Sequence, residues 1–225
     1  MKRLILIVLS SISLIVNGQE HSIGLEGGIN SSNIINLDDY YYWDLVNKNG
    51  PTIGINYEHK WNNHFFIKAG IQYNEIGFKY KYENILNVSF PPGTEIPWIN
   101  HTYHYIGLPF GCGLSLGLKF QGFFSIGLLP SLRLKATTDY LSISDGVYRG
   151  ILQDDSRYYN PKIDHGVPIN IGCGYYLSTN MQVYTSVRYQ ISLLSFRELD
   201  DSEAMNLRHH FFSFVFGIKY SIKKN

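Results

Sequence analysis

The sequence is poor in charged residues, in cysteine and, beyond its N-terminus, in long apolar runs. Only 16% of its 225 residues are charged, whereas soluble domains carry about 25%. No later segment reaches the ~20 apolar residues that a transmembrane helix requires. The two cysteines, Cys112 and Cys173, have neither the number nor the spacing of a disulfide scaffold or a zinc site. A helical membrane protein and a disulfide-stabilised domain are therefore excluded.

The N-terminus has the composition of a secretory signal peptide. Lys2 and Arg3 precede an apolar run that is interrupted only by serines, and short residues follow as far as Gly18. The run is short for a helix that must cross ~30 Å of hydrocarbon, which disfavours an uncleaved anchor. We therefore expect residues 1–18 to be removed by cleavage near Gly18, and residues 19–225 to form a single domain.

The chain also lacks an excess of basic residues. Loss of Lys2 and Arg3 with the signal peptide would leave 17 of the 19 basic residues against 18 acidic ones, a net charge of −1. A protein that binds nucleic acid needs a basic patch to displace counterions from the phosphates. Nucleic acid is therefore not expected as a partner.

Tyrosine, phenylalanine and glycine are abundant, and they are arranged with a period of two. The 18 Tyr, 13 Phe and 21 Gly suit a sheet that turns one face toward lipid and carries aromatic residues at its rims. From Phe212 to Ile222, large apolar residues occupy every second position, and small or polar residues lie between them. The same alternation predicts eight strands, at residues 21–30, 51–60, 64–80, 102–116, 119–134, 165–178, 182–191 and 211–222.

The connections between these strands alternate in length. Short polar turns are expected near residues 61–63, 118–119 and 178–180, and long segments at about residues 31–50, 83–100, 135–164 and 196–207. Outer-membrane barrels combine short periplasmic turns with longer external loops and an even number of strands. Because every backbone polar group must be paired in lipid, the sheet must close on itself. The predicted fold is all-β: a closed, antiparallel, eight-stranded up-and-down transmembrane β-barrel.

Five charged residues fall on the face opposite the apolar one and are predicted to lie inside the barrel. They are Glu26, Glu58, Lys68, Arg188 and Lys219. An eight-stranded barrel is only wide enough to be filled by its own side chains, and unpaired charges in that interior would be very costly. We expect these residues to form a structural network of ion pairs and hydrogen bonds, which disfavours an open pore.

Two segments carry a more specific strand pattern. YIGLPFGCGLSL at residues 105–116 places Pro109 four residues after a tyrosine, and DHGVPINIGCGYYL at residues 164–177 is followed by a strand that contains Arg188 and Tyr189. This pattern resembles the PorT-type outer-membrane β-barrel family of the Bacteroidetes. The resemblance implies an outer-membrane location and a role beside envelope or secretion proteins, and it carries over no functional residues.

No set of residues predicts catalysis, a cofactor or a metal ion. Residues 113–117 match the G-x-S-x-G nucleophile pattern around Ser115, but that elbow requires a following helix, and strand alternation continues here. We therefore expect no enzyme activity and no cofactor. Tyr41, Tyr42 and Trp43, in the first long segment, are candidates for contact with a partner or for a belt at the lipid headgroups.

These features predict a non-enzymatic outer-membrane β-barrel protein with a structural, interaction or secretion-accessory role through its external loops. The expected partners are outer-membrane lipid and envelope or secretion proteins. Three alternatives stay open. A soluble lipocalin-like barrel would bind an apolar ligand inside, a membrane-embedded enzyme would need an acid–base set at the barrel mouth, and a narrow channel would conduct ions.

Overall fold

The computed structural model describes residues 20–36, 45–61, 64–81, 98–144, 147–154, 162–194, 196–199 and 204–223. Every regular element in these ranges is a β-strand, and none of them holds a helix long and apolar enough to cross a membrane. The predicted signal peptide and the loop residues Tyr41, Tyr42 and Trp43 lie outside the described residues.

The described residues form eleven strands. They are β1 (Glu20–Asn36), β2 (Val46–Lys60), β3 (Phe65–Lys81), β4 (Trp98–Gly107), β5 (Phe110–Leu116), β6 (Phe120–Ser144), β7 (Val147–Asp154), β8 (Ile163–Tyr176), β9 (Met181–Ser192), β10 (Phe196–Leu199) and β11 (Ala204–Lys223).

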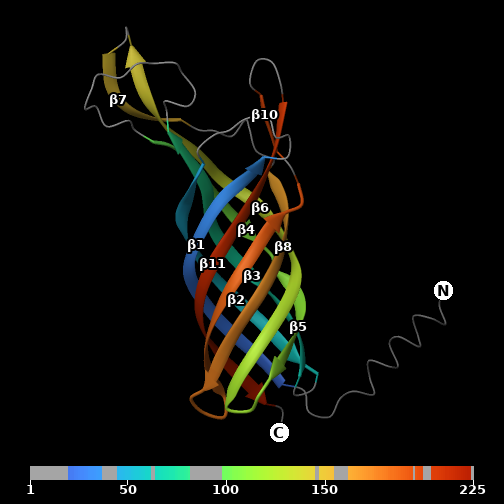
Figure 1. Cartoon of the computed structure of the whole chain (residues 1–225). Helices are drawn as coiled ribbons and strands as arrows, with labels where there is room; N and C mark the ends of the chain where they lie inside the picture. The colour runs from blue at the N-terminus through green and yellow to red at the C-terminus, as the bar shows by residue number, and fades with distance from the viewer. Residues whose placement is uncertain are drawn as a thin grey trace, which may run out of the picture.

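All paired strands are antiparallel, and the main order follows the chain: β1-β2-β3-β4-β6-β8-β9-β11. β1 also pairs with β11, from Glu20 opposite Lys223 to Asn36 opposite Leu207. In Figure 1 the strands wind around a common axis, and the hairpin strands β7 and β10 extend from one end of it. The predicted all-β, antiparallel, up-and-down arrangement is therefore confirmed.

The prediction of one continuous strand at residues 102–116 is wrong, because β4 ends before Pro109 and β5 begins after it. Proline has no backbone N–H and cannot donate to a strand ladder. β4 and β5 nevertheless lie between the same neighbours, β3 and β6. The Leu108 amide donates to the Pro130 carbonyl at 2.9 Å, and the Gly70 amide donates to the Pro109 carbonyl at 2.9 Å. The chain thus remains hydrogen-bonded to both neighbouring strands, β3 and β6, across the break.

The predicted long segments are also wrong in extent, because the strands run further into them. β1 and β2 together take up much of residues 31–50, β6 and β7 much of residues 135–164, and β10 and β11 part of residues 196–207. In the first of these extensions the outward face carries the polar side chains of Ser31, Asn33 and Asn47. The alternation of outward apolar residues along β1 therefore ends before the backbone pairing of β1 with its neighbours ends.

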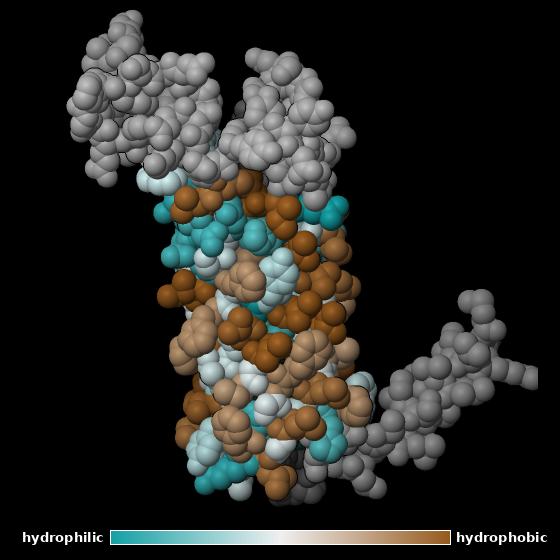
Figure 2. All heavy atoms as spheres, viewed as in Figure 1, coloured by the Kyte–Doolittle hydropathy of each residue, from teal (hydrophilic) through white to brown (hydrophobic). Residues whose placement is uncertain are grey.

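The two faces of the strands differ sharply in polarity. Large apolar side chains are exposed on the outside, among them Ile23, Leu25, Ile29, Ile53, Ile55, Phe110, Leu114, Phe124, Ile171, Val187, Phe214, Phe216 and Ile218. Figure 2 shows hydrophobic residues over much of the visible side of the tube of strands. Polar side chains are buried inside, among them Asn30, Thr52, Asn56, Gln72, Asn74, Ser125, Gln190 and Ser213. This distribution is the reverse of a soluble protein's.

Candidate functional site in the strand interior

One carboxylate holds together side chains from four strands at the middle of the interior. Oε1 of Glu26 on β1 accepts from Nη2 of Arg188 on β9 at 2.6 Å. Its Oε2 accepts from Nζ of Lys68 on β3 at 2.9 Å, from the Tyr184 hydroxyl at 2.9 Å and from Nδ2 of Asn56 on β2 at 3.1 Å. A buried carboxylate needs such partners, because an unpaired charge in a low-dielectric interior is very costly.

A second ion pair lies nearby. Nζ of Lys219 on β11 donates to Oε2 of Glu58 on β2 at 2.6 Å. The same ammonium group lies 5.0 Å from the ring centroid of Tyr184 and 5.5 Å from that of Phe123, within the range of cation–π attraction. Tyr184 therefore contacts both charged groups, since its hydroxyl bonds Glu26 and its ring faces Lys219.

The structure places all five charged residues of the predicted network inside, in two groups: Glu26 with Lys68 and Arg188, and Glu58 with Lys219. Neutral amides that sequence reasoning missed extend the first group. The Arg188 guanidinium also donates to Oε1 of Gln72 at 2.5 Å and to Oδ1 of Asn170 at 2.6 Å. The signal for these amides was their position on the same alternate face as the charges. We call Glu26, Asn56, Glu58, Lys68, Gln72, Asn170, Tyr184, Arg188 and Lys219 the polar layer.

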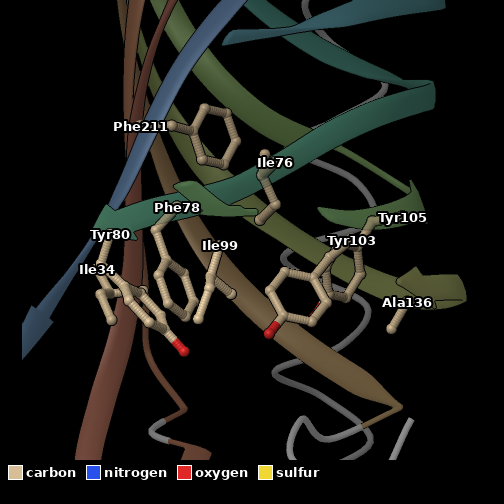
Figure 3. Packing of buried hydrophobic residues seen from close by; sticks show 9 residues of the cluster. All are labelled: Ile34, Ile76, Phe78, Tyr80, Ile99, Tyr103, Tyr105, Ala136 and Phe211. Carbon is tan, nitrogen blue, oxygen red and sulfur yellow. The ribbon is translucent and has the colours of Figure 1, made fainter. Parts of the chain in front are cut away.

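Further along the same strands, toward the end that carries β7 and β10, the interior becomes apolar. We call this cluster the aromatic layer: Ile34, Ile76, Phe78, Tyr80, Ile99, Tyr103, Tyr105, Ala136 and Phe211. Figure 3 shows these side chains, which come from β1, β3, β4, β6 and β11. The Phe78 side chain is only 1% exposed. The alternation of apolar residues along the sequence did not indicate this internal apolar layer.

At this level the outer face carries a polar patch on β1 and β2. Nδ2 of Asn33 on β1 donates to Oδ1 of Asn47 on β2 at 2.9 Å, and Nδ2 of Asn47 donates to the Ser31 hydroxyl at 3.2 Å. All three side chains lie at the surface. Asn47 is paired with Phe78 across β2 and β3, so the exposed amides and the aromatic layer share one level. Exposed amides are unfavourable in hydrocarbon, so we expect this side of the level to lie outside the lipid.

Two histidines are buried within the aromatic layer. The His101 ring stacks on Phe78 at a centroid distance of 4.6 Å, and the His209 ring meets Tyr103 edge-on at 5.1 Å. Burial disfavours the charged imidazolium and lowers the pKa of His101 to about 4. Burial, with smaller contributions from His101 and His210, lowers the pKa of His209 to about 3. Both histidines are therefore neutral at physiological pH.

The G-x-S-x-G pattern around Ser115 does not form a nucleophile elbow. Ser115 lies buried in β5, and the chain turns at Gly117, whose φ is +108°, into another strand instead of a helix. A nucleophile elbow requires that helix. No group of three or more His, Cys, Asp or Glu residues converges as a metal site among the described residues.

Comparisons with known proteins give matches at low identity to solved structures of outer-membrane proteins. Ail, the attachment invasion locus protein of Yersinia pestis, is 15% identical, with 91% of this chain and 99% of that chain covered and a TM-score of 0.42. OprG from Pseudomonas aeruginosa is 9% identical, with coverages of 92% and 97% and a TM-score of 0.49. The outer membrane protease OmpT from Escherichia coli is 10% identical, with coverages of 92% and 97% and a TM-score of 0.42.

A protein-family model also matches most of the chain. No curated protein gives a match. The model of the outer membrane protein beta-barrel domain matches residues 17–196, which include all strands from β1 to β9.

Proposed function

Because the chain belongs to the outer membrane protein beta-barrel domain family, we propose that it is a closed barrel of eight strand positions that acts without catalysis through its external end. The proposal includes membership among the PorT-type proteins of the Bacteroidetes. It also includes a role in association with envelope or secretion proteins. The filled interior is the observation that carries the proposal.

Closure is supported by the pairing of the first and last strands. β1 pairs with both β2 and β11 over most of its length, which leaves neither edge of β1 free. β4 and β5 occupy one position between β3 and β6, so the main path counts eight positions. In lipid, a sheet with an unpaired edge would expose backbone polar groups at a cost of several kcal/mol each.

The polar layer supports a barrel that does not conduct. Glu26 and Arg188 approach each other across the interior from β1 and β9, and Lys219 and Glu58 do so from β11 and β2. The cavity beside Lys68, Gln72 and Arg188 has a volume of about 30 Å³, which accommodates about one water molecule. A charged interior of this kind also disfavours the soluble carrier of an apolar ligand, because such a carrier needs an apolar lining.

The external end is the part of the molecule left free to bind. β6 with β7 and β10 with β11 form hairpins that project beyond the other strands at the same end (Figure 1). The other end is built from short connections, such as the one between β8 and β9. A rigid tube with projecting hairpins suits recognition by loops, because a scaffold holds the binding segments in place. Proteins of the envelope or of a secretion system are the proposed partners.

The first test is the gel mobility of the protein from purified outer membranes, boiled and unboiled in detergent. A closed barrel resists unfolding by the detergent, so the unboiled protein is expected to migrate faster than the boiled one. In planar lipid bilayers the same material is expected to give no discrete single-channel currents. A soluble protein without a mobility shift would overturn the barrel, and stable conductance would overturn the filled interior.

A further inference from the structure

Two histidines lie side by side on the outer face at the end opposite the projecting hairpins. His21 on β1 and His59 on β2 are direct partners in the antiparallel register. Their neighbours on the same face, such as Ile23, point outward. The two Nδ1 atoms are 3.3 Å apart, and the ring centroids are 4.6 Å apart. Register therefore fixes two imidazoles at one point of the surface.

A tyrosine hydroxyl reaches the same ring nitrogen. The Tyr57 hydroxyl oxygen lies 2.5 Å from Nδ1 of His21, so that nitrogen has two polar atoms within hydrogen-bond distance. An imidazole nitrogen carries either one lone pair or one hydrogen, and it makes one good hydrogen bond at a time. Only one of the two contacts can be a full hydrogen bond in any tautomer. A cation bound to Nδ1 of both rings removes this competition, and a water on the cation can bond the Tyr57 hydroxyl.

We propose that His21 and His59 bind a divalent transition-metal ion, of which Zn²⁺ is the representative, through their Nδ1 atoms. Two nitrogen ligands on a tetrahedral Zn²⁺ lie about 2.0–2.1 Å from the metal, which places them about 3.3 Å from each other. Neutral imidazole suits zinc, copper and nickel. With Nδ1 of His21 bound to the metal, that nitrogen no longer bonds the Tyr57 hydroxyl, which then orients a metal-bound water.

The site differs from a closed structural metal centre. Two imidazoles leave two positions of a tetrahedral ion for water or for an external ligand. Trp61 shields one side, with its ring centroid 5.5 Å from that of His59. The side chain of Lys60, which follows His59 on β2, turns away from the site, since its Nζ donates to Gln121 inside the barrel. The result is an exchangeable site that clamps the start of β1 to the end of β2.

The test is a calorimetric titration of the folded full-length mature chain, in detergent and without a polyhistidine tag, with ZnCl₂. One site per chain is expected. His21→Ala and His59→Ala should each weaken binding about 100-fold, and Tyr57→Phe about tenfold. His165→Ala removes an exposed histidine on β8, and this control should leave the affinity unchanged. The unboiled gel mobility of each variant verifies that the barrel has formed.

A second measurement identifies the ligands directly. With one equivalent of Cu²⁺, the electron paramagnetic resonance spectrum of the wild-type chain should show coupling to two imidazole nitrogens, and each single histidine variant should show one. Absence of binding by the wild type up to about 1 mM Zn²⁺, an affinity too weak to matter, would overturn the proposal. Equal affinity in His21→Ala, His59→Ala and wild type would overturn it as well, and the pair would then be a neutral hydrogen-bonded contact.

Discussion

The polar layer and the aromatic layer occupy successive levels of one interior and are built on opposite principles. In the polar layer, Glu26 and Arg188 are buried while Leu25 is 57% exposed on the outside. In the aromatic layer, Phe78 is buried while Asn33 and Asn47 hydrogen-bond on the outside. The hydrophobic effect stabilises an interior only where water would otherwise contact it. The interior is thus polar where the outer face is apolar, and apolar where Asn33 and Asn47 make part of the outer face polar.

The largest expected effect comes from removing the central charge of the polar layer. Glu26→Gln leaves Arg188 and Lys68 buried without a counter-ion, which should lower the free energy of unfolding by about 3–5 kcal/mol. Urea unfolding in lipid vesicles, followed by tryptophan fluorescence, measures this loss. Glu75→Gln is the matched control, because the Lys48–Glu75 pair is less buried than Glu26 and Arg188, and its loss should lower the free energy of unfolding by less. Similar losses of unfolding free energy in Glu26→Gln and Glu75→Gln would contradict the special role of the buried charge in the polar layer.

A cavity in the aromatic layer should cost about as much as in a soluble protein. Phe78→Ala removes a fully buried ring, and we expect a loss of about 3 kcal/mol in the same unfolding assay. Phe214→Ala removes an outward ring that is 50% exposed. Lipid can fill the space left by Phe214, so no cavity remains and the loss should be smaller. A larger loss for Phe214→Ala would show that packing against lipid, not the internal layer, dominates.

Acid should weaken the aromatic layer selectively. The depressed pKa values of His101, about 4, and His209, about 3, mean that the unfolded chain binds more protons than the folded chain below about pH 6.5. The free energy of unfolding is therefore highest at neutral pH with respect to these two histidines, and it falls as the pH falls from about 6.5 toward 4. The loss at pH 4.5 should be on the order of 2 kcal/mol per histidine.

The measurement for this prediction is the free energy of unfolding as a function of pH. Replacing both buried histidines, as in the double variant His101→Gln and His209→Gln, should reduce the slope of the profile between pH 4.5 and 6.5, while His59, His104 and His210, whose pKa values burial also lowers, keep part of it. His165→Gln, at an exposed position, serves as the control and should keep the wild-type slope. An unchanged slope in the double variant would locate the acid sensitivity elsewhere.

The smallest effect is expected on the outside of the aromatic layer. Asn47→Ala removes two exposed hydrogen bonds, to Asn33 and Ser31, and should change the free energy of unfolding by no more than about 0.5 kcal/mol. A loss of about 1–2 kcal/mol would instead indicate that this level lies in hydrocarbon, where exchange with water is absent. This variant therefore defines where the lipid ends.

The lipid-facing part of the fold could be predicted because its pattern is simple. From Phe212 to Ile222, outward residues are large and apolar at every second position, and the structure pairs this segment with both β1 and β9. The inward position of Glu26 and Arg188 follows from the same alternation. Which residues of the network pair with each other does not follow from the alternation, because it depends on which strands face each other across the barrel.

The aromatic layer was missed although its signal is present in the sequence. On β3 the large residues Phe65, Ile67 and Ile71 occupy odd positions and point outward, whereas Ile76 and Phe78 occupy even positions and point inward. The alternation changes phase near Glu75, where the strand leaves the lipid. On β1 the run of outward apolar residues ends at Ile29 and is followed by Ser31 and Asn33, which is why the predicted loop over residues 31–50 was too long.

The seam between β1 and β11 joins opposite ends of the polypeptide, with Glu20 beside Lys223. Such non-local pairing is intrinsically slow, since the entropy of closing the largest loop in the chain is lost before any pairing compensates for it. Until the last strand arrives, β1 presents an unpaired edge that can capture another chain. Loss of β11 through truncation or stalled export should therefore yield an aggregating product instead of a smaller barrel, which makes the twenty residues of β11 a checkpoint for assembly.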